Sequence, residues 1–408
     1  MHSAATFDPL MKPDSHRDSP ASPPTPLRPD HAKSVPRLGV LGGGQLSKMT
    51  ASAAANFGCE VVVVEREDDF PANSLDSHAL IGDWNDPALL RQLAPLVDVV
   101  TLENEFVSAD ALTVLVEQKL PVWPTPDTMR LVRDKLRQKS VFSAAGLPVA
   151  RFADAPDKQA VRDFGFPLVL KRRYGGYDGK GNATVRDASG LDEAWEKLGG
   201  GENPLYVEEF CDFEQELAII VTRSIDGSMV HYPVVETVNR DHICHVVKAP
   251  ADVPDRIAAE VGSVAEKAVE SINGVGSFGL ETFLTRDGRV LINEIAPRVH
   301  NTGHYTIEGC LCSQFENHVR AVLGWPLGSP GMIAPAAVMV NLLGGGSGSG
   351  EPVGLRDALA VSGAFIHIYG KTRSTRGRKM GHVTALGDTV EEALGIATRA
   401  AAAIKFGA

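Results

Sequence analysis

The chain has 408 residues, more than one hydrophobic core usually serves, so we expect two or three domains. Its composition, 43% hydrophobic and 22% charged residues, is ordinary for a globular protein, and no apolar run is long enough to span a bilayer. A net charge of −11 disfavours a broad nucleic-acid surface, and five scattered cysteines disfavour a disulfide framework. We therefore expect a cytoplasmic protein without membrane or nucleic-acid partners.

Residues 1–36 are rich in proline, serine, aspartate and histidine and hold few large apolar side chains. Such a segment cannot bury enough surface to offset the entropy of ordering it. It also lacks the hydrophobic region of a signal peptide. The composition predicts a disordered tail.

The first folded stretch predicts a strand, a glycine turn at residues 42–44, an amphipathic helix and a buried strand over Val61–Val64. An acid, Glu65, follows about twenty residues after the turn, as in a dinucleotide-binding fingerprint. Ser47 occupies the third glycine position, so the match is incomplete. The turn equally suits a substrate phosphate at the helix N-terminus, so two interpretations remain open.

A further parallel strand is expected over residues 97–102, and it delivers Glu103 and Glu105 at its carboxyl end. Ligands of open α/β sheets bind at this edge, so these acids are candidates for a substrate contact, against loop solvation or helix capping. A proline-rich turn then separates this part from a basic helix over residues 128–145. Basic helix faces of this kind are usually solvated.

Residues 167–181 combine a short apolar strand, Lys171 at its end and a loop with glycines at 175, 176, 179 and 181. Glycine-rich backbone can fold its N–H groups over an anion, and Lys180 adds a cation inside the loop. The loop is no Walker A motif, because Gly181 follows Lys180 where serine or threonine is needed. The pattern favours polyphosphate binding over a solvated hairpin.

Two apolar segments, residues 279–284 and 290–295, flank an Asp-Gly turn and predict an antiparallel hairpin. Pairing would bring Glu281 and Glu294 together across the sheet, with Asn293 beside them. Mg²⁺ prefers such oxygen ligands and often shares them with phosphates. The alternative is that both acids face solvent. This interpretation is less favoured, because both acids stand in otherwise apolar strands.

The C-terminal part is expected to hold a strand over residues 365–371, a basic turn and a last helix that Asp388 can cap. The cations Lys371, Arg376, Arg378 and Lys379 can complement a sugar phosphate, although surface solvation is an equal alternative. A polar loop over residues 296–304 follows the second hairpin strand and is a candidate for facing substrate.

Together these motifs resemble the ATP-grasp superfamily of ligases and, within it, the 5-(carboxyamino)imidazole ribonucleotide synthases of de novo purine synthesis. The resemblance covers residues 37–407 and is strongest at 43–46, 171–181, 293–304 and 377–382. It implies an α/β and α+β protein with an ATP-grasp fold, an N-terminal Rossmann-like domain and a small C-terminal β-rich domain. The implied units are residues 37–127, a lid subdomain at 128–207, a large subdomain at 208–330 and a C-terminal domain at 331–408.

The resemblance implies a reaction as well. ATP phosphorylates bicarbonate to carboxyphosphate, which carboxylates the exocyclic amine of 5-aminoimidazole ribonucleotide and leaves ADP and phosphate. ATP and Mg²⁺ are the implied cofactors, and members are often homodimers. The small-molecule substrates are ATP, bicarbonate and the ribonucleotide.

The resemblance also implies four sets of site residues. The implied ATP ligands are Lys135, Lys171, Gly176, Tyr177, Asp178, Gly179, Lys180, Gly181, Asn182, Glu208, Glu209, Phe210, Cys211, Glu216, Asn239, Asn293 and Glu294. The implied Mg²⁺ ligands are Glu281 and Glu294. The implied catalytic residues around bicarbonate and the amine are Tyr177, Asp178, Lys180, Arg298, His300 and Asn301. The implied ribonucleotide ligands are Gln45, Leu46, Glu103, Lys371, Arg378 and Lys379.

The chain departs from the family pattern in places. Asn239 stands where the family usually has a histidine near the nucleotide, and Lys135 stands where arginine is common. Two other functions stay open: the related formate-dependent glycinamide ribonucleotide formyltransferase, and a catalytically silent nucleotide-binding protein. The carboxylating enzyme is favoured over the first by the loop at 174–181 and by Asn301, and over the second by the retained Lys171 and Arg298.

Overall fold

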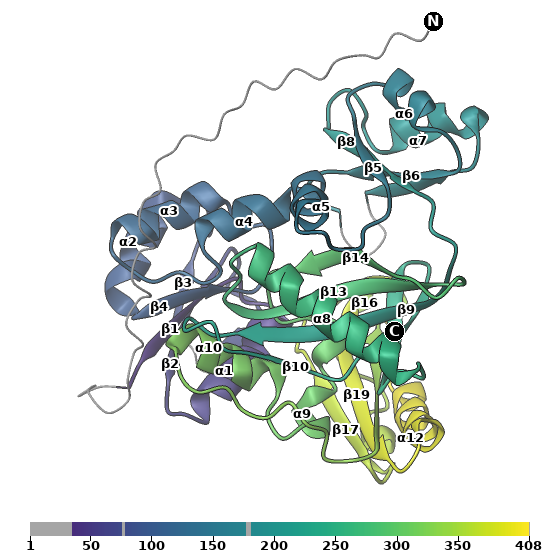
Figure 1. Cartoon of the computed structure of the whole chain (residues 1–408). Coiled ribbons are helices and arrows are strands. Elements are labelled where there is room, and N and C mark those ends of the chain that lie inside the picture. Colours follow the sequence, from purple (N-terminus) through teal and green to yellow (C-terminus); the bar gives the residue numbers. More distant parts are fainter. Residues whose placement is uncertain (1–34, 76–77, 177–180, 408) are drawn as a thin grey trace, which may run out of the picture.

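The computed structural model describes residues 35–75, 78–176 and 181–407. Figure 1 shows a main body from which one small part projects at the top of the view. The disordered tail predicted for residues 1–36 lies almost wholly outside the described ranges, so its disorder stays a prediction. Within those ranges no helix is both long and apolar enough to cross a bilayer.

The N-terminal part is a parallel four-stranded sheet in the order β3–β2–β1–β4. Its elements are β1 (Arg37–Leu41), α1 (Gln45–Ala55), β2 (Glu60–Glu65), β3 (His78–Ile81), α2 (Pro87–Leu93), β4 (Val99–Leu102) and α3 (Ala109–Glu117). The central strands are buried on both faces, which explains the unbroken valine run at residues 61–64. The predicted strand–helix–strand start is confirmed.

The predicted basic helix over residues 128–145 is interrupted, which corrects the interpretation from the sequence. The helix α4 (Pro126–Arg133) ends before Asp134, and α5 (Lys135–Ala144) begins after it. The Asp134 backbone is extended, and its carboxylate accepts hydrogen bonds from the amides of Leu136 and Arg137. A carboxylate in this position satisfies first-turn amides that have no partner within the helix. A new helix therefore starts at Lys135.

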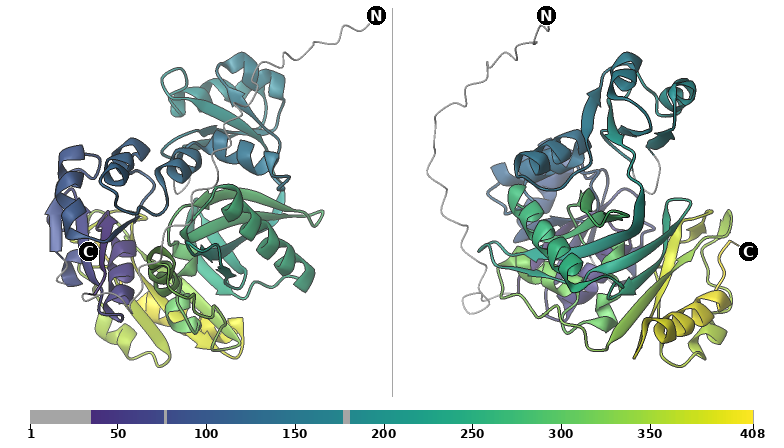
Figure 2. Two further views of the ribbon diagram at one scale, coloured as in Figure 1. Left: turned by 60° about the vertical axis from the view of Figure 1, so that its left-hand side comes forward. Right: turned by 45° about the vertical axis from the view of Figure 1, so that its right-hand side comes forward.

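The projecting part is an antiparallel sheet in the order β5–β8–β6–β7, which we call the lid sheet. Its elements are β5 (Phe152–Ala155), α6 (Lys158–Phe164), β6 (Leu168–Arg172), β7 (Asn182–Val185), α7 (Leu191–Lys197) and β8 (Leu205–Glu209). The lid sheet has its own core, in which Leu170, Trp195 and Val207 are buried. Figure 2 shows it standing clear of the body in both views. A separate core lets such a unit shift as a whole.

A nine-stranded sheet forms the rest of the body, in the order β14–β13–β9–β11–β12–β15–β19–β17 with β10 beside β9. Its strands are β9 (Phe213–Arg223), β10 (Met229–His231), β11 (Val235–Arg240), β12 (Ile243–Ala249), β13 (Gly276–Thr285), β14 (Val290–Ala296), β15 (Ala336–Leu343), β17 (Ala364–Ile368) and β19 (Lys379–Gly387). The remaining elements are α8 (Asp255–Ser271), α9 (Thr306–Gly309), α10 (Gln314–Leu323), β16 (Gly348–Ser349), α11 (Leu355–Leu359), β18 (Arg373–Ser374) and α12 (Val390–Ala403).

Two helices join this sheet to its surroundings. Apolar residues of α8, such as Val261 and Ala265, share a core with Phe278 on β13. The helix α10 reaches the N-terminal part, because Phe315 and Val319 belong to one core with residues of β1 and α1. The first part and the large sheet are therefore packed together as a fixed body, in contrast to the lid sheet.

The C-terminal strands continue the large sheet, because β12 pairs with β15 with Val247 opposite Met339. The helix α12 covers this end through the buried Ala393 and Ala397. Hydrogen bonding therefore runs unbroken past residue 331, the predicted start of the C-terminal domain. The domain boundaries drawn from the sequence stay predictions.

The cap of the last helix differs from the prediction. Thr389, and not Asp388, is the N-cap of α12, and its hydroxyl accepts a hydrogen bond from the Glu392 amide at 3.2 Å. The Glu392 carboxylate in turn accepts from the Asp388 amide at 2.9 Å. This is a reciprocal capping box, in which the residue three positions after the cap reaches back toward the preceding backbone.

Candidate active site

A cavity of about 700 Å³ lies where the N-terminal part, the large sheet and the basic C-terminal turn meet. Among the described residues that line it, seven are cationic and three are carboxylates. The cationic residues are Arg133, Lys135, Arg298, Lys371, Arg376, Arg378 and Lys379, and the acids are Glu103, Glu105 and Glu294. The cavity is thus a net positive site in a protein of net charge −11, as an anionic substrate requires.

The cavity gathers many of the predicted site residues from distant parts of the chain. All six predicted ribonucleotide ligands line it, as do three predicted catalytic residues and three predicted ATP ligands. These are Gln45, Leu46, Glu103, Lys371, Arg378 and Lys379; Arg298, His300 and Asn301; and Lys135, Gly176 and Glu294. One concave site of this size, with convergent polar groups, is the arrangement expected of a ligand pocket.

The glycine turn before α1 is occupied by carboxylates. Glu65 accepts a hydrogen bond from the Gly43 amide at 2.6 Å, and Glu103 accepts from the amides of Gly44 at 2.5 Å and Leu46 at 3.2 Å. A phosphate at this helix N-terminus would compete with two acids for the same N–H groups. The prediction that this turn receives a phosphate, and with it the dinucleotide interpretation, is therefore not supported.

Glu105, predicted from its place after β4 as a candidate for a substrate contact, is engaged by another protein side chain. Glu105 forms an ion pair with Arg298, with the Nε–Oε2 distance at 2.7 Å. Burial opposes ionisation of this carboxylate, but the Arg298 guanidinium outweighs it and lowers the pKa of Glu105 to about 2. The pair stays charged at neutral pH and fixes the guanidinium in the cavity. Its sequence signal was the position of Glu105 at a strand end.

The loop after β14 positions His300 and Asn301. Burial and then the charge of Arg298 lower the pKa of His300 to about 3, so its imidazole is neutral at pH 7. The Asn301 amide makes a reciprocal pair with Asn341 on β15, at 3.0 Å and 2.7 Å. The Asn301 side chain thus uses one donor and its acceptor in binding the large sheet. Its partner Asn341 was not predicted from the sequence.

The C-terminal cations are held by backbone carbonyls. The Lys371 ammonium donates to the Lys379 carbonyl at 2.7 Å, and Arg378 donates to the Arg373 carbonyl at 2.6 Å. These contacts hold the two ends of the basic turn together, and four of its cations, Lys371, Arg376, Arg378 and Lys379, line the cavity. The arrangement suits a phosphate group, which matches guanidinium and ammonium donors.

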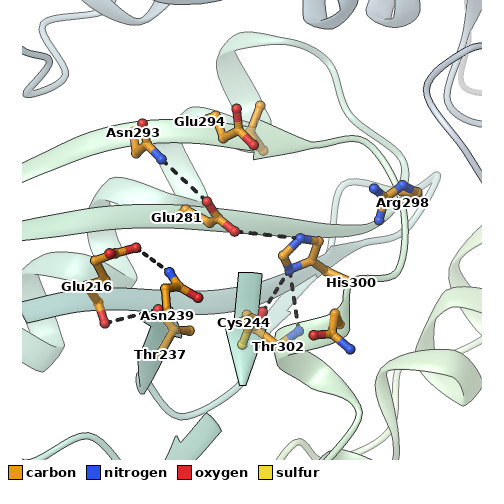
Figure 3. A network of polar contacts seen from close by, with 12 residues as sticks. Glu216, Thr237, Asn239, Cys244, Glu281, Asn293, Glu294, Arg298, His300 and Thr302 are labelled. Carbon is orange, nitrogen blue, oxygen red and sulfur yellow. Dashed lines mark hydrogen bonds and ion pairs between the residues drawn. The ribbon is translucent and has the colours of Figure 1, made fainter. Parts of the chain in front are cut away.

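The predicted hairpin of β13 and β14 is confirmed, and Glu281 lies directly opposite Glu294. Figure 3 shows both carboxylates on the same face, with Asn293 donating to Glu281. Burial and then the Glu294 charge raise the pKa of Glu281 to about 7. Two oxygen donor groups that repel each other fit a divalent cation, which would stabilise both as carboxylates. The residues present are therefore suited to hold Mg²⁺.

Predicted ATP ligands surround this carboxylate pair. The Lys135 ammonium forms an ion pair with Glu294. Lys171, from the lid sheet, contacts Glu208 at 2.8 Å and Asn293 at 3.4 Å, so it links the lid sheet to β14. These lysines come from α5 and β6, which flank the hairpin from two sides.

The position where the family usually has histidine is part of a polar pair. Asn239 on β11 donates a hydrogen bond to the Glu216 carboxylate on β9 at 2.5 Å. Figure 3 places this pair on the same face as Glu281, at the next strands of the sheet. Asn239 therefore orients Glu216, a predicted ATP ligand, through a donor that a histidine also possesses.

A second cavity of about 320 Å³ lies where the lid sheet joins the large sheet. The predicted ATP ligands Glu209, Phe210 and Cys211 line it, together with Leu291 of β14. Half of its described lining residues are charged, while Phe210 and Leu291 supply apolar surface that a flat aromatic base could contact.

The glycine loop is described only at its ends. The predicted ligands Tyr177, Asp178, Gly179 and Lys180 lie outside the described residues. Gly181 has φ +95°, and a Cβ there would lie 2.9 Å from the Gly176 Cα, so the two described ends of the loop approach closely enough to require glycine. Asn182 follows at the start of β7, opposite Lys171.

One residue of the basic helix contradicts the expectation of a solvated face. The Lys139 side chain is 2% exposed and contacts Glu208 at 3.3 Å and the Ile292 carbonyl at 2.8 Å. Sequence reasoning missed it because a lysine among other cations carries no sign of burial. One signal was available: Lys139 follows Lys135 by four residues, so both lie on the same face of the helix, and Lys135 lines the cavity.

Comparisons with known proteins agree with this geometry. The chain matches the ribonucleotide synthetase preATP-grasp domain over residues 35–133, the ATP-grasp domain over 140–315 and the phosphoribosylaminoimidazole carboxylase C-terminal domain over 337–395. It is 41% identical to the N5-carboxyaminoimidazole ribonucleotide synthase of Synechococcus elongatus, covering 86% of this chain and 89% of that protein. It also spans about two thirds of the length of carboxylases such as that of Ogataea methanolica, at 41% identity.

Solved structures show the same fold. The N5-carboxyaminoimidazole ribonucleotide synthetase of Thermotoga maritima superimposes with a TM-score of 0.82 at 37% identity, covering 91% of this chain and 99% of that one. The Aspergillus clavatus synthase, in complex with ADP and 5-aminoimidazole ribonucleotide, gives 0.82 at 35% identity, covering 90% and 98%. The expected ATP-grasp fold is confirmed.

Proposed function

Since the chain belongs to the N5-carboxyaminoimidazole ribonucleotide synthase family, we propose that it uses ATP to carboxylate the exocyclic amine of 5-aminoimidazole ribonucleotide with bicarbonate. A bicarbonate oxygen attacks the γ-phosphorus of ATP, and the bond to ADP breaks. The amine nitrogen then attacks the carbonyl carbon of the resulting carboxyphosphate. Phosphate leaves, and the nitrogen loses a proton.

The nucleotide half of the site comprises Lys171, Glu208, Glu216, Glu281 and Glu294. We assign the phosphates of ATP to Lys171 and Lys135, and the adenine to the hinge recess at residues 209–211. Glu281 and Glu294 would hold Mg²⁺, which supplies charge neutralisation for the phosphates when bound. Positioning and charge neutralisation are the main demands of phosphoryl transfer.

The acceptor half comprises the residues that line the larger cavity around Glu103, Glu105, Arg298 and Lys371. We assign the ribonucleotide phosphate to Lys371, Arg378 and Lys379, because these three cations come from one basic turn and line the same cavity. Arg298, held by Glu105, would stabilise the negative charge that develops on the bicarbonate-derived group.

The observation that carries this proposal is the shared cavity. Glu294 lies both in the carboxylate pair of the nucleotide half and in the lining of the acceptor half. A phosphorylated intermediate formed at Glu294 would therefore reach the acceptor without leaving the protein. Carboxyphosphate is prone to hydrolysis, so short transfer and exclusion of water favour the productive reaction.

The test is an assay of phosphate release from ATP and Mg²⁺ with each possible acceptor. We expect release that depends on 5-aminoimidazole ribonucleotide and bicarbonate, with ¹⁴C from bicarbonate appearing in a carbamate that acid decomposes. A Glu294→Ala sample prepared alongside measures contaminating ATPase. Release that depends instead on glycinamide ribonucleotide and formate would replace this proposal with the formyltransferase, and nucleotide binding without any turnover would support a silent protein.

Two attributes complete the proposal. We place the protein in the cytoplasm, where ATP and bicarbonate are available. The homodimer expected from the family resemblance stays a prediction, which sedimentation of the purified chain tests directly.

A further inference from the structure

We propose that Lys139 is a positioning residue for ATP binding: it balances half of the Glu208 charge, so that Lys171 keeps a net positive charge for the phosphates. The inference rests on the proposed assignment of ATP phosphate to Lys171. The Lys139 side chain lines neither of the two cavities and lies behind the nucleotide half.

Glu208 is the centre of a buried cluster. Its Oε2 contacts the Lys171 ammonium at 2.8 Å, while its Oε1 contacts Lys139 at 3.3 Å and accepts a hydrogen bond from the Tyr206 hydroxyl at 2.9 Å. The side chains of Glu208 and Lys139 are 5% and 2% exposed. At such burial, charges interact strongly and water screens them little.

The charges of this cluster do not cancel. Burial lowers the pKa of Lys139 and the Glu208 charge opposes that shift; with both lysines protonated, two ammonium groups face one carboxylate and the three side chains carry a net charge of +1. Burial disfavours ionised Glu208, but Lys139 and Lys171 outweigh it and lower its pKa to about 2. Without Lys139, Lys171 and Glu208 would form a neutral pair, and a phosphate approaching Lys171 would also meet the full charge of the carboxylate.

The geometry leaves Lys171 able to act. An ammonium group has three N–H donors, and the contacts of Lys171 with Glu208 and Asn293 account for two acceptors among the described residues. Lys139 is instead fixed from behind, because it donates to the Ile292 carbonyl of β14. One lysine is thus held in the body and the other is presented from the lid sheet.

The cluster also joins two units that pack separately. Lys139 and Ile292 belong to α5 and β14 of the body, whereas Lys171 and Glu208 belong to the lid sheet. The Lys139–Glu208 contact therefore sets where the lid sheet stands relative to the carboxylate pair at Glu281 and Glu294. Both effects, charge and placement, predict weaker nucleotide binding when Lys139 is neutral.

Calorimetric titration of ADP and ATP, without acceptor, separates charge balance from mere packing. We expect Lys139→Met to weaken nucleotide binding at least about tenfold, since a charge-assisted contact is made ineffective. In the Glu208→Gln background the further change Lys139→Met should cost less than about threefold, because no carboxylate charge is then left for Lys139 to balance. Glu208→Gln alone completes the cycle.

A matched control is Lys48→Met. Lys48 also donates to backbone carbonyls, those of Ile368 and Tyr369, but lies far from the nucleotide half in α1. Its KM for ATP should stay at the wild-type value. In turnover assays Lys139→Met should raise the KM for ATP and leave the KM for the acceptor unchanged.

A loss caused by Lys139→Met that is equally large in the wild-type and Glu208→Gln backgrounds would overturn the proposal, as would unchanged binding in Lys139→Met. The double variant has no buried carboxylate at position 208 that lacks the Lys139 cation. Its binding, compared with that of Glu208→Gln, therefore still tests the proposal if Lys139→Met alone folds poorly. Binding is measured without turnover, so a wild-type protein that binds ATP but fails the carboxylation assay would refute the proposed function and leave this inference standing.

Discussion

In the acceptor half, the carboxylates of Glu103 and Glu105 are matched by backbone amides and by Arg298, respectively, whereas in the nucleotide half Glu281 and Glu294 face each other across a hairpin. The pKa values follow the nearest partner of each acid: that of Glu105, beside Arg298, is lowered to about 2, that of Glu281, beside Glu294, is raised to about 7, and burial raises that of Glu103, which has only amide donors. In the acceptor half the carboxylates have protein partners and the cations are in excess, as an anionic substrate requires, whereas the carboxylate pair of the nucleotide half is suited to a divalent cation.

The two halves also differ in mechanical setting. The acceptor half lies within one packed body, because α10 joins the N-terminal part to the large sheet through Phe315 and Val319. The nucleotide half lies between that body and the lid sheet, which has a core of its own. A rigid acceptor pocket with a movable nucleotide clamp fits a reaction in which ATP must be enclosed before a labile intermediate forms.

The largest predicted effect comes from breaking the nucleotide half at Glu294. We expect Glu294→Ala to lower kcat about a thousandfold, because it removes the carboxylate that we propose as a metal ligand and that also contacts Lys135. Phosphate release under saturating ATP, Mg²⁺ and acceptor measures it. Glu270→Ala, at an exposed position of α8, should retain full activity. Near-normal turnover of Glu294→Ala would refute the metal assignment.

A smaller effect is expected from loosening the acceptor half at Arg298. Arg298→Lys keeps the charge but loses the planar fork that Glu105 holds, so kcat/KM for the acceptor should fall about a hundredfold. ADP affinity should not change, because the nucleotide half is untouched. Arg130→Lys is the matched control, since Arg130 contacts two exposed carboxylates. A loss of ADP affinity equal to the loss in kcat/KM would erase the distinction between the halves.

The basic C-terminal turn gives the next effect. Lys371→Met should raise the KM for the acceptor about tenfold with little change in kcat, because one phosphate contact is worth about that factor. The KM of the wild type should also rise with salt, which screens such contacts. Lys267→Met, on the exposed face of α8, serves as the control. A change in KM for ATP alone would place Lys371 in the other half.

The smallest effect tests the departure from the family at Asn239. Asn239→His should change the KM for ATP by less than about threefold, because an imidazole N–H can replace the amide donor to Glu216. Asn239→Leu removes the donor and should raise that KM by about tenfold. Equal KM values for the histidine and leucine variants would show that the donor to Glu216 is unimportant.

Several local features were predictable because neighbours along the chain create them. The glycine turn after β1, the valine run of β2 and the Asp-Gly hairpin of β13 and β14 follow from backbone freedom and short-range pattern. The turn sets the register as far as Thr282 opposite Ile292, but the shift that brings Glu294 rather than Asn293 opposite Glu281 is a β-bulge, which the pattern does not show. The break at Asp134 was missed, because helical periodicity continues through it while its tertiary contacts with Arg173 and Tyr174 do not show in the pattern.

The sequence by itself determined the strand–helix elements, the family resemblance and the set of charged residues available for chemistry. Tertiary structure alone decided the partners: Glu105 with Arg298, Asn301 with Asn341, and Lys139 with Glu208. The two residues of each pair lie between 40 and 193 positions apart in the chain. Side-chain pairing across such separations depends on how whole sheets pack, and burial, which converts a common surface lysine into a fixed cation, arises only from that packing.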